Sequence, residues 1–360
     1  MSSRSTHPRS RRQSLWAVTG AALAVLLLQV AFSPPARADW LSDLLGGTTT
    51  STAPGGTTTT TQNSLCWLFN TCATTTTKAP TTTTTAPTTT TTAAPLTCGG
   101  VPTLPKAGGG TWTCSFDDEF TATTLDRTKW FPQPTDGSGF SSGGQDCYVD
   151  SPNNVSVSGG TLVLTSRKEA APFTCRANAS TSWQTQVTSG SVSTYGGRFS
   201  QAYGRFEVRA KVTGAKVKGL QESFWLWPDN PTKFGGWPLS GEIDIAEIYH
   251  QYPDRAIPFI HYNNPYDPNV TNNYCMINDI AQFHTYVAEW TPTSIKIIYD
   301  GVTCLEDAWA PAAPQTGRQP FDQPFIIALT QALGISTNAY DPATTPLPAS
   351  TLVDYVRVYK

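Results

Sequence analysis

The sequence predicts an all-β domain over residues 96–360, folded as one large β-sandwich. Short runs of apolar or alternating residues recur between turn signals along this segment, and we find no long helical period. All-β folds of this size also commonly remain single domains. The runs lie at residues 155–166, with a hairpin turn at 158–160, and at residues 204–212, 243–248, 283–290, 294–299 and 352–359.

The amino terminus has the pattern of an export signal. Four arginines among the first twelve residues precede an apolar run over residues 15–32, and Pro34, Pro35 and the segment Ala36–Ala38 follow it. We therefore predict a signal peptide over residues 1–38 and a protein that is secreted or associated with the cell wall. The run is about as long as the shortest membrane span, so an uncleaved anchor remains an alternative. After cleavage we expect no stable membrane insertion.

Residues 39–95 form a Thr/Pro-rich linker in the sequence. Such tracts bury too little apolar surface to offset the entropy of ordering, and they resemble O-glycosylated stalks. One island interrupts the linker, where Cys66 and Cys72 bracket Trp67, Leu68 and Phe69. It is either a small disulfide loop with an apolar tip or a spacer without a partner.

The composition argues against a nucleic-acid partner. The chain carries 24 basic and 26 acidic residues and a net charge of −2, so it lacks the excess of cations that phosphate contacts require. Aromatic residues make up 11% of the chain. They fit a large core and also fit flat surfaces on which sugar rings stack. Composition alone does not separate these two uses.

Eight cysteines in a chain with an export signal indicate four disulfides. No close Cys-x-x-Cys pair is present, and the four histidines show no ligand spacing, which argues against a metal site at these residues. The sequence does not fix the connectivity. Pairing of nearest neighbours would join Cys66 to Cys72, Cys98 to Cys114, Cys147 to Cys175, and Cys275 to Cys304.

The segment Gly241–Glu247 places three carboxylates within six residues, interleaved with apolar residues. In a strand, Glu242 and Asp244 share one face while the isoleucines share the other. Strict alternation would bury Glu247. A bulge of one residue near Ala246 would turn it back, so that all three acids line one face.

Three acids on one face point to glycosidic-bond hydrolysis. Retaining enzymes use two carboxyl groups about 5 to 5.5 Å apart, one as nucleophile and one as acid and then base. Because neighbouring carboxylates repel one another, at least one pKa in the row should rise. We expect Glu247 to hold a proton while Glu242 stays ionised. A calcium site or a solvated strand face are the alternatives.

Several motifs occur in the order typical of one enzyme family. Besides the three acids, they are Asp118–Phe120 with Lys129 and Trp130, Tyr203–Arg209, Ser223–Pro228, Trp237–Ser240, Phe283–Trp290 and Asp354–Tyr359. With these motifs the chain resembles glycoside hydrolase family 16, in the laminarinase-like form with a bulged E-x-D-x-x-E motif. The resemblance implies a β-jelly-roll sandwich of two antiparallel sheets with a concave substrate cleft, with Glu242 as nucleophile, Asp244 as helper and Glu247 as acid/base.

The resemblance also implies residues that bind the substrate. Trp225 and Trp237 match positions that flank the cleft, and ordinary core packing is the alternative for each. Arg209 matches a segment beside the nucleophile, where it would contact sugar hydroxyls or the acids, unless it lies on an exposed strand face. His261 matches a histidine near the acid/base, with a structural role as the alternative. We interpret His284 as structural.

Relatives of this type often hold a structural calcium, which would implicate Glu119 and Asp354. A charge-satisfied surface is the alternative. The resemblance implies no required redox or organic cofactor, a polysaccharide as the partner, and a monomer.

Two departures from the family pattern bear on the substrate. Gln221 and Glu222 stand where many relatives carry a Trp-Pro pair, and Thr330, Gly334 and Ile335 stand where they carry Asn and Gly-Gly. The catalytic row is intact, so the reaction type is a safer inference than the substrate. Among β-1,3-glucan, mixed-linkage glucan and β-linked galactans, we favour β-1,3-glucan. A transglycosylase or a non-catalytic carbohydrate-binding lectin on the same fold are the alternatives, although a lectin would typically have lost one of the two glutamates.

Overall fold

The computed structural model describes residues 96–143, 145–267 and 269–360. The predicted signal peptide over residues 1–38, the linker over 39–95 and the Cys66–Cys72 island lie outside the described residues. The strands are β1 (Thr103–Pro105), β2 (Thr111–Asp118), β3 (Phe131–Pro132), β4 (Cys147–Tyr148), β5 (Val155–Ser158), β6 (Thr161–Arg176), β7 (Ser182–Ser193), β8 (Gly204–Thr213), β9 (Leu220–Pro228), β10 (Glu242–Tyr249), β11 (Ile257–His261), β12 (Asn269–Thr271), β13 (His284–Trp290), β14 (Ile295–Tyr299), β15 (Val302–Asp307), β16 (Phe325–Leu333) and β17 (Ala349–Tyr359), with short helices α1 (Thr135–Ser138) and η1 (Ser336–Asn338).

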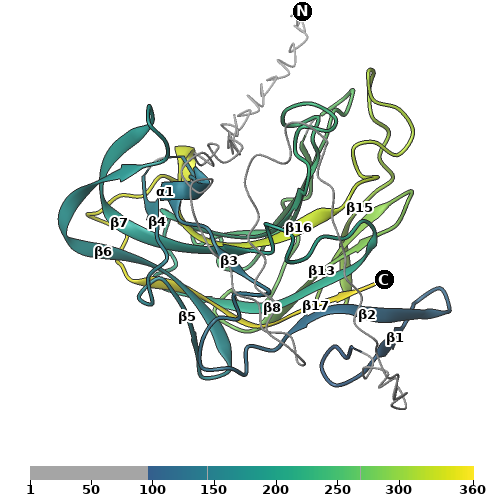
Figure 1. The fold of residues 1–360 in the computed structure, drawn as a ribbon, viewed down its shortest axis with the longest axis horizontal. Coiled ribbons are helices and arrows are strands. Elements are labelled where there is room, and N and C mark those ends of the chain that lie inside the picture. Colours follow the sequence, from purple (N-terminus) through teal and green to yellow (C-terminus); the bar gives the residue numbers. More distant parts are fainter. Residues whose placement is uncertain (1–95, 144, 268) are drawn as a thin grey trace, which may run out of the picture.

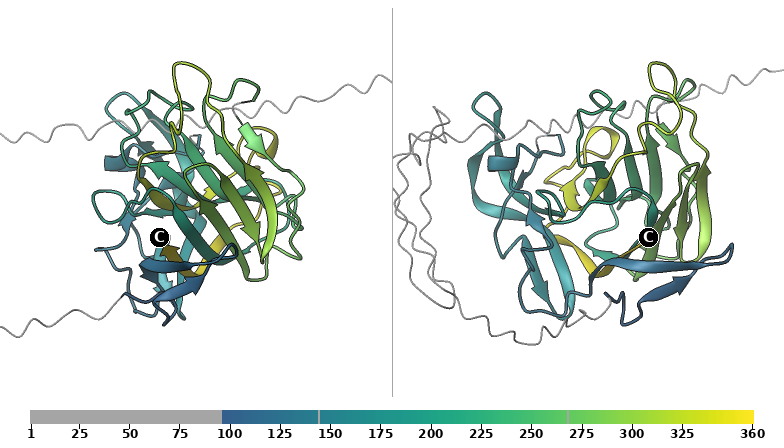
Figure 2. Two further views of the ribbon diagram at one scale, coloured as in Figure 1. Left: turned by 90° about the vertical axis from the view of Figure 1, so that its right-hand side faces the viewer. Right: turned by 45° about the vertical axis from the view of Figure 1, so that its right-hand side comes forward.

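The strands form two antiparallel layers (Figure 1). The first layer has the order β12, β11, β10, β9, β16, β7, β3. The second layer has the order β15, β14, β13, β8, β17. The other edge of β17 pairs with β6 along its first half and with β2 along its second half. The pair β1 and β2 therefore extends the edge of the second layer (Figure 2).

The long hairpin of β6 and β7 joins the two layers. The start of β6 pairs with β17 in the second layer, and its later part pairs with β7. The end of β7 then pairs with β16 in the first layer. Adjacent strands cross from one layer to the other here, so the layers form one continuous hydrogen-bonded network.

The core lies between the two layers. From β10 it takes Ile243, Ile245, Ala246 and Ile248, all with 0% exposure, and they pack in one cluster with residues of β8, β13 and β17. Burial of apolar surface of this kind is the main free-energy term that favours folding. The other face of the first layer, which points away from the core, is thereby free to carry a functional site.

The structure confirms the predicted all-β sandwich, and every predicted run contains strand residues. It also confirms the nearest-neighbour disulfides Cys98–Cys114, Cys147–Cys175 and Cys275–Cys304. Within the described residues, no helix has the length and apolar character that a membrane span requires.

Candidate active site

A one-residue bulge in β10 turns the three acids to the same face. Against β9, Asp244 pairs with Trp225 but Ala246 already pairs with Phe224, so β10 has one extra residue. The same shift appears against β11, between Asp244 and Glu247. Two consecutive residues, Ile245 and Ala246, therefore face the core, and Glu247 returns to the opposite face. The predicted bulge is confirmed.

The backbone enters this strand through Gly241. Its φ of +82° lies in the left-handed region, and a Cβ added there would come within 2.8 Å of Pro320 Cγ. A residue with a side chain would be strained at this position. The turn that leads into the acid strand thus depends on glycine.

The acids line a cleft of about 480 Å³ on the outer face of the first layer. Strands β9, β11, β12 and β16 supply its floor beside β10, and loops supply its rim. Side chains around the acids include Phe140, Gln221, Ser223, Trp225, Trp237, Tyr249, Phe259, His261, Asn269 and Thr330. Aromatic faces and convergent polar groups in one concave surface are typical of a ligand site.

Glu242 is held by the loop that precedes its strand. The indole Nε1 of Trp237 donates a 2.6 Å hydrogen bond to Oε2 of Glu242. Burial, and then the charge of Asp244, raises the pKa of Glu242 well above its usual value. His261 and the bond from Trp237 act in the opposite direction.

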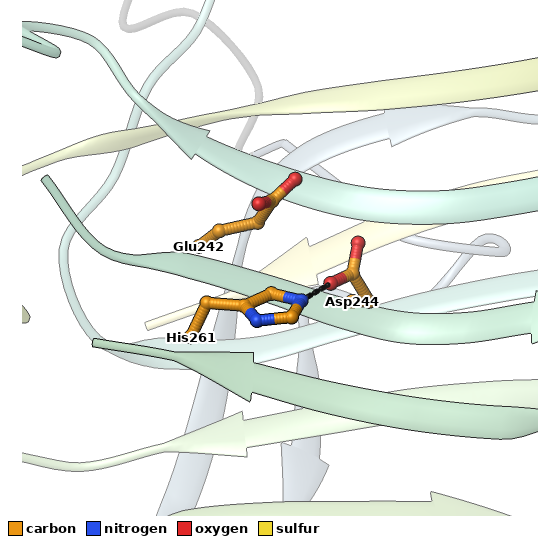
Figure 3. A group of neighbouring side chains, drawn as sticks. All are labelled: Glu242, Asp244 and His261. Atoms are coloured by element: carbon orange, nitrogen blue, oxygen red, sulfur yellow. Dashed lines mark ion pairs between the residues drawn. The ribbon is translucent and has the colours of Figure 1, made fainter. Parts of the chain in front are cut away.

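Asp244 and His261 form a pair beside Glu242 (Figure 3). His261 Nε2 lies 3.1 Å from Asp244 Oδ2, and its Nδ1 lies 2.8 Å from Asn269 Oδ1. Burial raises the pKa of Asp244 to about 8. The structure therefore pairs His261 with the helper acid, and His261 also acts to lower the pKa of Glu247, the acid/base near which it was expected.

Glu242, Asp244 and His261 are also the described residues whose donor atoms could hold a metal ion, since these atoms lie within 4.8 Å of one another. A carboxylate and imidazole set of this kind suits a transition metal. The interactions already made by each member account for the cluster without one: Trp237 binds Glu242, and Asp244 and His261 bind each other.

Glu247 has a different environment. Gln221 Nε2 donates a 3.0 Å hydrogen bond to its Oε1, and the hydroxyl of Tyr249 donates a short hydrogen bond to its Oε2. Burial, and then the charge of Asp244, raises the pKa of Glu247 to about 7, while Tyr249 and Gln221 work against that rise. A carboxyl group that titrates near neutrality suits a group that gives and then takes a proton.

All three pKa values are raised, so the row retains protons at neutral pH. The predicted like-charge effect is present, and burial is the larger cause. Burial raises the pKa of Glu242 as well as that of Glu247, while the hydrogen bond from Trp237 favours the ionised form of Glu242, so the expected split between the two glutamates stays a prediction.

Trp225 and Trp237 both line the cleft, as predicted. Trp225 is 4% exposed, stacks on Phe140 with ring centroids 6.0 Å apart, and donates to Thr330 Oγ1. Most of its surface is therefore used in packing. That either ring stacks on sugar remains a prediction.

The prediction for Arg209 is wrong. Arg209 lies on β8 in the second layer, where it forms an ion pair with Asp354 and lies 4.7 Å from the ring centroid of Phe283. The family resemblance implied a place beside the nucleophile, and the alternative, an exposed strand face, describes Arg209 instead. His284 is structural, as predicted: its ring nitrogens bind Asp300 and the carbonyl of Asp279.

The residues named for calcium do not fit that ion. Glu119 accepts two hydrogen bonds from Arg357, at 2.7 and 2.9 Å, and Asp354 is paired with Arg209. A guanidinium already neutralises each carboxylate. The alternative reading, a charge-satisfied surface, describes both residues.

Gln221 and Tyr249 are site residues that sequence reasoning missed. Tyr249 follows Glu247 by two positions, so period-2 alternation could have placed it on the cleft face. Gln221 appeared only as a departure from the family pattern. Its contact with Glu247 depends on the pairing of β9 with β10, which the sequence alone does not reveal.

Known proteins resemble the chain across this domain. Residues 144–339 match the model of glycosyl hydrolases family 16. Glucan endo-1,3-beta-glucosidase A1 of Niallia circulans is 30% identical over 285 residues, which cover 72% of this chain and 39% of that protein. Keratan-sulfate endo-1,4-beta-galactosidase of Sphingobacterium multivorum is 33% identical over 177 residues, covering 46% and 38%. The chain thus spans less than half the length of either relative.

The fold also matches solved structures. The X-ray structure of endo-beta-1,3-glucanase from Pyrococcus furiosus aligns with a TM-score of 0.59 at 28% identity, covering 72% of this chain and 98% of that one. The predicted antiparallel jelly roll is thereby confirmed. Because the family model matches more than half of the chain, the chain belongs to glycosyl hydrolases family 16.

Proposed function

We propose that this chain is a secreted endo-β-glycosidase that hydrolyses polysaccharide with retention of configuration, and that β-1,3-glucan is its substrate. The bulge in β10 carries the proposal, because it turns Glu242, Asp244 and Glu247 into one cleft. Secretion is supported by the export-signal pattern at residues 1–38 and by the disulfides.

The reaction proceeds by double displacement. Ionised Glu242 attacks the anomeric carbon, the glycosidic C–O bond breaks, and Glu247 gives its proton to the leaving oxygen. Glu247 then takes a proton from water as that water attacks the same carbon, and the bond to Glu242 breaks. The two inversions give retention overall.

The different surroundings of the two glutamates support these roles. The N–H of Trp237 favours the ionised, nucleophilic form of Glu242. The pKa of Glu247, near 7, lets it act as acid in one step and base in the next. Asp244, with its pKa raised to about 8, holds a proton at neutral pH and so limits repulsion of the Glu242 carboxylate.

Support for a β-1,3-glucan comes from the names of the relatives, a Niallia glucan endo-1,3-beta-glucosidase and a Pyrococcus endo-beta-1,3-glucanase. A β-linked galactan is the second candidate. The Sphingobacterium relative is named a galactosidase, and Gln221, which stands where the family resemblance implies the Trp of a Trp-Pro pair, lines the cleft.

The test is an assay of the purified full chain on laminarin, lichenan, β-galactan and agarose, with the products sized. We expect laminarin to give short oligosaccharides. Products longer than the starting chains would indicate a transglycosylase, and binding without cleavage of any of the four would contradict the proposal in favour of a lectin.

A further inference from the structure

Two neutral side chains donate hydrogen bonds to the two carboxylate oxygens of Glu247. Gln221 Nε2 reaches Oε1 at 3.0 Å, and the Tyr249 hydroxyl reaches Oε2. Burial, and then the charge of Glu247, raises the pKa of Tyr249 well above its usual value, so the hydroxyl keeps its proton and remains a donor. Both oxygens of the Glu247 carboxylate are thus hydrogen-bonded by side chains that line the cleft.

The sheet register brings these donors together. Gln221 on β9 is the direct cross-strand partner of Tyr249 on β10, and Ser223 is the partner of Glu247. Side chains of cross-strand partners lie on the same face of a sheet, about 5 Å apart. Gln221 and Tyr249 therefore lie side by side on the cleft face, next to the Ser223–Glu247 pair, and both side chains reach Glu247.

The next residue of each segment forms a second pair on the core side. Glu222 is 0% exposed and lies 3.0 Å from His250 Nε2. Gln331 Nε2 donates to Glu222 Oε1 at 2.7 Å, and His250 Nδ1 lies 2.9 Å from the carbonyl of Ala215. Gln221–Glu222 and Tyr249–His250 thus interact as two dipeptides, with one pair in the cleft and the other in the core. The buried pair fixes the strand ends that carry the donors.

We infer that Gln221 and Tyr249 are positioning residues that hold the Glu247 carboxylate by donating one hydrogen bond to each of its oxygens. The inference rests on the proposed role of Glu247. Burial and Asp244 favour the protonated form of this group. Hydrogen bonds donated to both oxygens favour the ionised form, which is the form that must act as base.

The experiment measures the proton affinity of Glu247 directly. The full chain, labelled with ¹³C at the glutamate side-chain carboxyl, is titrated by NMR, and Glu247→Gln identifies the signal. Tyr249→Phe and Gln221→Leu each remove one donor and keep a similar shape. We expect each to raise the proton affinity about tenfold, which moves the midpoint up by about one pH unit. The double variant should move it further.

The control is Tyr266→Phe, because Tyr266 is 96% exposed and does not line the cleft. Its midpoint should equal that of the wild type. A midpoint unchanged in Tyr249→Phe and Gln221→Leu alike would overturn the inference. If Tyr249→Phe fails to fold, Gln221→Leu alone decides.

Activity on laminarin separates this inference from the proposed function. The basic limb of kcat/KM against pH should move up in step with the NMR midpoint, which a purely structural defect would not produce. If Glu247→Gln cleaves laminarin at the wild-type rate, the acid/base assignment fails, while the NMR midpoint still tests whether Gln221 and Tyr249 hold the carboxylate.

Discussion

Trp237 donates a 2.6 Å hydrogen bond from its indole nitrogen to Oε2 of Glu242. The residue was expected in the cleft as a stacking surface, and the structure gives it a second role as the donor that favours the ionised nucleophile. Because this N–H, together with His261, opposes the effect of burial on the pKa of Glu242, the bond bears directly on the pH range in which Glu242 can attack.

Trp237→Phe keeps an aromatic ring and removes this donor. We expect the pKa of Glu242 to rise, so that the acidic limb of kcat/KM on laminarin moves to higher pH and the rate below that limb falls about tenfold. A kinetic pH profile measures both. Trp112→Phe, in β2 and away from the cleft, is the control. An acidic limb in the same place would remove the proposed role of the indole N–H.

Azide distinguishes the two glutamates. Glu247→Ala should lower kcat by roughly 10²- to 10⁴-fold, and the loss in Glu242→Ala should be at least as large. Azide should rescue each variant on an aryl glycoside with a good leaving group. We expect an inverted glycosyl azide from Glu242→Ala and the opposite anomer from Glu247→Ala, identified by proton NMR. The same anomer from both would refute the assignment.

The catalytic row was predictable because it depends on local alternation. Period 2 along Glu242–Glu247 required one extra residue, and the bulge between Asp244 and Glu247 supplies it. The strands β9 and β16 were not identified as full elements. Their residues are buried almost throughout, since one face packs on the core and the other carries the cleft and its aromatic cluster, so no alternation is visible.

Contacts that depend on tertiary pairing could not be predicted. The family resemblance implied that Arg209 lies beside the nucleophile, but the layer that holds β8 follows from its pairing with β13 and β17. Likewise, no role for Glu222 could be inferred from the sequence, because its contact with His250 forms only in the folded sheet. Sequence thus predicted the chemistry of the row better than the residues that surround it.

Asp244 should make stability fall as the pH rises. Its carboxyl has a pKa of about 8 in the fold, against about 3.9 in an unfolded chain. Between these values the folded state binds more protons, so the free energy of unfolding decreases with increasing pH. Asp244→Asn should make the decline of Tm from pH 5 to pH 8.5 shallower, although not flat, because Glu247 titrates in the same range.

Thermal melts across that range measure the effect. Asp341→Asn is the control, since its pKa is lowered by hydrogen bonds from Ala343 and Thr344 and its titration is complete below pH 5. An Asp244→Asn decline as steep as that of the wild type would show that Asp244 does not titrate between pH 5 and 8.5.

Arg209→Met should leave catalysis intact. Arg209 pairs with Asp354 in the layer opposite the cleft, and both side chains are about one third exposed, at 37% and 34%. Exposed pairs of this kind contribute only about 0 to 1 kcal/mol after solvent screening. We therefore expect KM and kcat on laminarin to remain within about twofold and Tm to fall by a few degrees at most. Asp354→Asn should behave the same way, and the double variant should lose no more than either single one, because both remove one interaction. A large rise in KM for Arg209→Met alone would contradict this prediction, because it would mean that the guanidinium contacts the substrate.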